Sequence, residues 1–91
     1  MQTDKFIIKI RLSNGIWRCD CIEIKINEKL HYEIDITPPK GYTVKKLYKN
    51  VDFNFEHRSM DFSFTRWQFA DDEYAEVMEE ELSNKIIRRL I

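Results

Sequence analysis

Two cysteines, Cys19 and Cys21, are the residues best suited to metal or thiol chemistry, and they lie two positions apart. On a β-strand this spacing directs both side chains to one face of the sheet. A structural zinc site needs four ligands, usually from two paired clusters, and the chain adds only His31 and His57. The expected hairpin pairs Cys19 and Cys21 with Ile10 and Ile8, so neither histidine lies beside the cysteines. We therefore expect Cys19 and Cys21 to be small buried core residues, and we expect no metal or other cofactor.

The two histidines are also the candidates for acid–base catalysis. His31 falls on the polar face of an expected strand, and His57 lies in an expected turn next to Arg58. Neither is accompanied by a nucleophile at a recognisable spacing, and no glycine-rich loop is present to cradle phosphate. A small enzyme using His57 with Arg58 or Arg66 is one alternative, because catalytic groups assemble in space rather than in sequence. The favoured expectation is a protein that is not an enzyme.

Aromatic and basic residues indicate another alternative, a sheet that binds single-stranded nucleic acid. Such sheets stack bases on aromatic rings and contact phosphates through Lys and Arg. The net charge of −1 gives no overall basic field, which counts against this function. The candidates are Trp17, Arg18, Tyr42, Lys45, Lys46, Tyr48, Lys49, Arg58, Arg66 and Trp67. Tyr42, Tyr48 and Trp67 fall outside the clean strand alternation, so we expect them to be exposed.

Charge is distributed unevenly along the chain, which favours a protein partner. Residues 1–50 carry ten Lys/Arg and six Asp/Glu, whereas residues 51–91 carry five and ten. A surface of two opposite charges can orient a partner. The expected contacts lie on an acidic helix, 71–82, and in an edge region, 42–49: Glu76, Glu79, Glu80, Glu81, Tyr42, Lys45, Lys46, Tyr48 and Lys49. The favoured function is a non-enzymatic protein-binding module, an accessory or inhibitor protein of the kind that phages and mobile elements often encode.

Length and composition are typical of one compact domain spanning residues 1–91. The chain is 43% hydrophobic and 34% charged, with only two glycines and two prolines. No apolar run reaches the ~18 to 20 residues that a membrane span requires, and the N-terminus lacks the pattern of a signal peptide. We expect a cytoplasmic protein. Apolar residues left over at Ile7, Ile87 and Ile91 make a homodimer a further expectation.

The chain is organised around an aromatic segment, residues 51–67. Val51, Phe53 and Phe55 alternate with polar residues. After a polar break at residues 57–59, Met60, Phe62 and Phe64 do the same. Period-two alternation on both sides of a short break predicts a β-hairpin with one buried face. A long helical pattern follows this hairpin and is the expected cover for its apolar face.

The N-terminal half predicts three further strands. Residues 5–12 alternate, and Asn14-Gly15 is a strong signal for a two-residue hairpin turn. With Asn14 and Gly15 in the turn, the expected register pairs Leu12 with Trp17 and Lys9 with Asp20, and the same register pairs Ile10 with Cys19 and Ile8 with Cys21. The apolar phase changes at Cys21-Ile22, which indicates either a bulge or bend, or a strand whose two halves bury opposite faces.

The third strand is expected at residues 30–36, after a turn at residues 27–29. This turn would place Leu30, Tyr32 and Ile34 opposite Ile26, Ile24 and Ile22 respectively. Residues 38–39 are both proline and end the meander. Residues 42–50 form either a short edge strand, which we favour, or one helical turn.

The helix is expected from Asp71 to the C-terminus. Its apolar stripe recurs every four residues, acidic residues crowd its first half, and basic residues occupy its last turns. The stripe consists of Tyr74, Met78, Leu82, Ile86 and Leu90. The predicted fold class is therefore α+β: a curved antiparallel meander of about five strands followed by one C-terminal amphipathic helix packed on the sheet.

Overall fold

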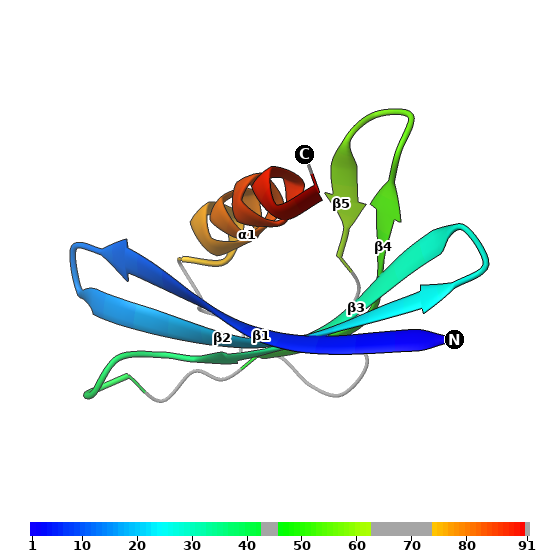
Figure 1. The fold of residues 1–91 in the computed structure, drawn as a ribbon. Helices are drawn as coiled ribbons and strands as arrows, with labels where there is room; N and C mark the ends of the chain where they lie inside the picture. Colours follow the sequence, from blue (N-terminus) through cyan, green and yellow to red (C-terminus); the bar gives the residue numbers. More distant parts are fainter. Residues whose placement is uncertain (43–45, 63–73, 91) are drawn as a thin grey trace.

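A computed structural model of the chain describes residues 1–42, 46–62 and 74–90 (Figure 1). Within them an antiparallel sheet has the order β1-β2-β3-β4-β5, and one helix follows it. The elements are β1 (Gln2–Leu12), β2 (Gly15–Ile26), β3 (Lys29–Thr37), β4 (Lys46–Asn54), β5 (Ser59–Asp61) and α1 (Ala75–Leu90). The sheet is strongly curved, and α1 lies on its concave side (Figure 1). The predicted α+β meander with a C-terminal helix is confirmed.

The turn between β1 and β2 consists of Ser13 and Asn14, so that Leu12 faces Gly15 rather than Trp17. The register predicted from the Asn-Gly pair is therefore wrong by two residues. Asn14 is held in the turn because its Oδ1 accepts a hydrogen bond of 2.9 Å from Trp17 Nε1. Gly15 has φ +131° and already belongs to β2.

This correction changes the cross-strand pairs but not the faces. Lys9 lies opposite Arg18 instead of Asp20, and Ile10 lies opposite Trp17. A shift of two residues keeps each side chain on its original side of the sheet, because side chains alternate with a period of two. The predicted inner face of β1 and β2 is therefore retained, whereas the predicted attraction between Lys9 and Asp20 as directly opposed residues is wrong.

We expect Gly15→Ala to lower the free energy of unfolding by about 2 to 3 kcal/mol, because it combines backbone strain with a clash. A Cβ at Gly15 would lie 2.9 Å from Pro39 Cβ. Gly41→Ala is the matched control, since Gly41 has φ +100° but a Cβ at that position would meet no atom within 4 Å. It carries the strain alone and should cost about 1 kcal/mol. Urea unfolding of both variants measures the difference, and equal losses would contradict a contact between Gly15 and Pro39.

β2 is a strand with two apolar faces and no bulge. Its pairing is uninterrupted with β1 over residues 15–25 and with β3 over residues 18–26. Cys19 and Cys21 point to the concave side and are buried, whereas Ile22 and Ile24, on the opposite side, are only partly buried. The bulge offered for Cys21-Ile22 is therefore wrong. The apolar residues of the two halves lie on opposite faces, as the alternative predicts, but the second half is not buried, since Ile26 is 43% exposed.

The β2–β3 register also differs from its prediction, here by one residue. Leu30 faces Lys25, and Ile34 faces Cys21 rather than Ile22. A shift of one residue exchanges the two faces of a strand. The apolar residues of β3 consequently join the face that carries the cysteines, beneath α1, and the turn shortens to Asn27 and Glu28.

β4 confirms that residues 46–49 form a strand, but it lies between β3 and β5 and is not an edge strand. Its pairing with β3 shifts between Tyr32, which faces Val51, and Ile34, which faces Tyr48. The extra residue on β4 at this irregularity places both Tyr48 and Val51 on the concave face. Tyr48 is only 1% exposed, so the prediction that it is exposed is wrong.

The aromatic hairpin forms, although its turn comes earlier than expected. Residues 55–58 make the turn, and Phe53 pairs with Met60 across the two strands. Val51, Phe53 and Met60 are buried as predicted. Phe55 lies in the turn and is 55% exposed, so its predicted burial is wrong. Phe64 lies outside the described residues.

α1 packs on the concave face through every fourth residue. Met78, Leu82 and Ile86 are buried, as the apolar stripe predicts, whereas Leu90 at the C-terminal end of α1 is 38% exposed. Glu76 in its first turn and the arginines in its last turn complement the helix dipole. The predicted start at Asp71 lies outside the described residues. In the described chain no helix has both the length and the apolar character needed to cross a bilayer.

Candidate functional site

The structure brings Tyr42 and Tyr48 of the predicted edge region close to the first turns of α1. The Tyr42 ring packs edge-on against Tyr74, the residue just before α1, with ring centroids 6.1 Å apart. Both rings also contact Trp17, at 6.1 Å and 5.4 Å. Trp17 is buried and Tyr42 is 40% exposed, so Tyr42 carries this aromatic cluster to the surface. The predicted exposure of Tyr42 is confirmed.

A hydrogen bond ties β4 to α1 a few residues further along both segments. Tyr48 Oη donates to Glu79 Oε1 at 2.9 Å. Glu79 is consequently only partly exposed and is engaged within the molecule. No regular spacing links residues 31 positions apart in the chain, so the sequence contains no signal for this contact.

The other predicted acids of α1 are arranged differently. Glu76 and Glu80 are exposed, and Glu81 is partly buried. Val77, beside Glu76 on the helix, leaves 44% of its surface exposed. Residues at positions i and i+4 lie on one side of a helix, so Glu76 and Glu80 flank the same side. We call Glu76, Val77, Glu80 and Tyr42 the α1 surface.

The structure does not describe the side chains of several predicted contact residues. Lys45, Arg66 and Trp67 are outside the described residues, and Lys46 and Lys49 belong to β4 with undescribed side chains. Their predicted roles stay predictions.

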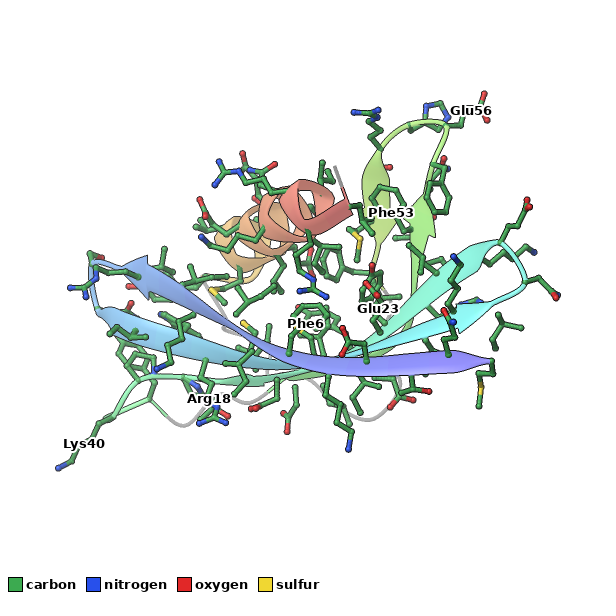
Figure 2. All side chains as sticks on the ribbon, in the orientation of Figure 1. Phe6, Arg18, Glu23, Lys40, Phe53 and Glu56 are labelled. Carbon is green, nitrogen blue, oxygen red and sulfur yellow. The ribbon has the colours of Figure 1, made fainter. Side chains whose placement is uncertain are left out.

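Two of the three described aromatic residues proposed for base stacking are core residues. Trp17 and Tyr48 are 2% and 1% exposed, so neither ring can receive a base. Arg18 lies on the convex side of the sheet, away from α1 (Figure 2), and bonds Asp20 Oδ1 through Nε and Nη2 at 3.2 and 3.1 Å. Arg58 lies in the exposed turn between β4 and β5 with φ +50°. The described part of the predicted stacking platform is therefore reduced to Tyr42 and Arg58.

Each histidine interacts with a nearby polar residue. His31 lies on the polar face of β3, as predicted, and its Nδ1 forms a hydrogen bond with the carboxylate of Asp52, its cross-strand neighbour on β4. His57 lies in the exposed turn, where its backbone N–H donates to Asn54 Oδ1 at 3.0 Å. Neither contact brings a nucleophile to a histidine ring.

Cys19 and Cys21 are buried thiols of the core, as predicted. Burial, reinforced by neighbouring acidic groups, raises the pKa of each thiol from 9.0 to about 12. A thiol with so high a pKa is neutral at physiological pH and a poor nucleophile. Among the described residues, no three or more His, Cys, Asp or Glu side chains are gathered so that they could hold a metal ion.

The concave face also holds polar contacts that the alternation did not predict. Tyr32 Oη, buried between sheet and helix, donates to Glu23 Oε2 at 2.7 Å, and burial raises the pKa of Tyr32. The Arg89 guanidinium lies 3.7 Å from the centroid of the Phe6 ring and 3.3 Å from Asp4 Oδ2. Figure 2 shows Phe6 and Glu23 beneath α1. These contacts hold the C-terminal part of α1 and the strands beneath it together.

The convex face carries a groove of about 650 Å³. Apolar residues form its floor, and carboxylates of β2 and β3 line it. The lining consists of Lys5, Phe6, Ile7, Asp20, Cys21, Ile22, Glu33, Asp35 and Leu47. From the sequence, only Ile7 indicated surplus apolar area on this face. Ile7 is 51% exposed.

Comparison with known proteins does not assign this fold to a class of known function. No family model matches the chain, and no significant match was found to a curated protein or to a solved structure. The function is therefore inferred from the residues of this chain alone.

Proposed function

We propose that the protein is a non-enzymatic protein-binding module that presents the α1 surface to its partner. The observation that carries the proposal is an exposed apolar side chain, Val77, flanked by the exposed carboxylates of Glu76 and Glu80. Apolar groups framed by charge on a rigid element are suited to partner recognition, because the apolar groups supply affinity and the charges supply orientation.

The surroundings of this surface support a role in recognition. The half-exposed Tyr42 ring packs against Tyr74, the residue just before α1. Tyr is enriched at protein interfaces because it offers a large area with few rotatable bonds. The hydrogen bond from Tyr48 to Glu79 and the buried residues of α1 hold the helix against the sheet. The surface is therefore preorganised, which lowers the entropy lost on binding. The same proposal includes action as an accessory or inhibitor protein, an origin in a phage or mobile element, and homodimerisation.

Neutralising the exposed acids in Glu76→Gln/Glu80→Gln is expected to weaken partner binding about tenfold or more, because two charges at the interface are lost. Glu79 is left unchanged, since it accepts the Tyr48 hydrogen bond. A partner captured by the wild-type protein, once purified, is titrated against each variant by calorimetry. The melting temperature should stay within a few degrees of wild type, because exposed charges contribute little to stability.

Glu28→Gln/Glu56→Gln is the matched control. Both residues are exposed acids in turns between strands, so the control has the same net charge as the test variant without a change on α1. It should bind as the wild type does. Equal affinity of all three proteins for the partner would contradict binding through the α1 surface. Salt-sensitive binding of a single-stranded oligonucleotide in an anisotropy titration would instead favour the nucleic-acid alternative.

A further inference from the structure

Among the described residues, no strand pairs with the outer side of β1, which forms one long edge of the sheet. It spans eleven residues and pairs only with β2 among the described residues, whereas the opposite edge strand, β5, has three. Figure 1 shows β1 at the near edge of the sheet, with α1 above the concave face, where Arg89 contacts Asp4 and Phe6 of β1. A long unpaired edge strand offers a row of backbone donors and acceptors to another chain.

Two observations show which backbone groups of β1 face outward. Lys5 N–H donates to Asp4 Oδ1 at 3.0 Å instead of to β2. Leu12 and Gly15 close the two-residue turn, the position of a hydrogen-bonded pair in a hairpin. Because hydrogen-bonded and non-hydrogen-bonded pairs alternate, the outward groups are those of Lys5, Ile7, Lys9 and Arg11.

The side chains of these same four residues form a row on the convex face. Lys5, Lys9 and Arg11 are exposed cations, and Ile7 between them is 51% exposed. Across β1 and β2 they meet no carboxylate except at Ile7, which faces Asp20. Lys9 lies opposite Arg18, a like charge. Within the described residues none of the three cations makes an ion pair within 4 Å.

The alternate residues of β1 form a row of a different kind on the concave face. Ile8 and Ile10 are buried, and Phe6 and Leu12 are partly buried and pack against the core. A strand added at this edge would therefore place one row of side chains beside cations and the other beside the margin of the core. Matching chemistry requires acidic residues in the first row and apolar residues in the second.

We propose that the β1 edge accepts an extended segment of a partner protein in which acidic and apolar residues alternate. The segment adds a strand to the sheet, so that backbone hydrogen bonds supply affinity and the two side-chain rows supply specificity. A second copy of this chain is a poorer occupant, because pairing β1 with β1 would bring two rows of cations together. This surface is separate from the α1 surface, so the failure of either proposal leaves the other intact.

The test uses a labelled peptide as long as β1, with glutamate and valine alternating, and the same peptide with lysine in place of glutamate. We expect the acidic peptide to bind, to lose affinity as salt rises from about 50 to 500 mM, and to slow amide hydrogen exchange at Ile7, Lys9 and Arg11. The lysine peptide should not bind. Ile7→Pro removes an outward N–H without removing a bond to β2, and it should weaken the acidic peptide about tenfold.

A second variant, Lys9→Glu, tests the same edge without a proline that could disturb folding. Lys9→Glu should weaken peptide binding about tenfold while raising the melting temperature, since it replaces a like-charge pair with an attractive one opposite Arg18. Lys29→Glu is the matched control, because Lys29 is an exposed lysine at the start of β3. Equal binding to all variants, protection of amides elsewhere, or a homodimer with a protected β1 in sedimentation and exchange experiments would overturn the proposal.

Discussion

Replacing Leu82 with alanine is expected to lower the free energy of unfolding by about 3 kcal/mol. Leu82 is 0% exposed and stands at the centre of the buried stripe of α1, between Met78 and Ile86. The truncation removes apolar contact between helix and sheet and leaves a cavity that the curved sheet can only partly close. Urea unfolding monitored by far-UV circular dichroism measures the loss.

Val77→Ala is the matched control on the same helix. Val77 is 44% exposed, and alanine has a higher helix propensity than valine, so its effect should lie within about 0.5 kcal/mol. The Leu82 variant should also lose affinity for the partner, because the α1 surface depends on the docking of the helix. A Leu82→Ala variant as stable as Val77→Ala would mean that α1 does not pack as described.

The second large effect is a loss of stability at alkaline pH. The pKa values of Cys19 and Cys21 are raised from 9.0 to about 12 in the folded protein, chiefly by burial. A raised pKa means that the folded state retains protons which the unfolded state releases above about pH 9. The stabilisation is therefore complete below pH 9 and is lost as pH rises toward 12. Each thiol contributes a slope of up to about 1.4 kcal/mol per pH unit in this window.

Urea titrations between about pH 7 and pH 10.5 measure this slope. Cys19→Ala/Cys21→Ala should flatten the fall above pH 9, although it lowers stability at neutral pH by removing two buried sulfurs. Tyr32→Phe is the control for the tyrosine, whose pKa is also raised by burial and by its hydrogen bond to Glu23. Thiols that react readily with an alkylating reagent at neutral pH in the native protein, or an unchanged slope in the double variant, would contradict the described burial.

The local elements followed directly from patterns in the chain. Alternation predicted β1, β3 and the aromatic hairpin, and recurrence every four residues predicted α1 with Met78, Leu82 and Ile86 on its buried side. These patterns are reliable because the direction of a side chain is fixed by the period of its own strand or helix. The burial of Cys19 and Cys21 and the exposure of Ile7 followed in the same way.

The candidate site was predicted only in part. The sequence identified the acidic residues of α1 and Tyr42, but it could not show that Tyr42 reaches Tyr74 or that Glu79 is occupied by Tyr48. Such contacts join residues about thirty positions apart and carry no local pattern. The row of unpaired cations on β1 was also not predicted, because the predicted register placed Lys9 opposite the carboxylate of Asp20.

The sequence by itself therefore determined which segments are strands or helix and which face of most of them is apolar. Only the tertiary structure decided the registers, the position of β4 inside the sheet, and the burial of Tyr48. The physical reason is that an alternating pattern is unchanged when a strand slides by two residues. The register that forms then depends on contacts outside the strand. The hydrogen bond from Trp17 to Asn14 sets the first turn, and the irregularity in β4 turns Tyr48 inward. The helix selects the face of the sheet that is covered.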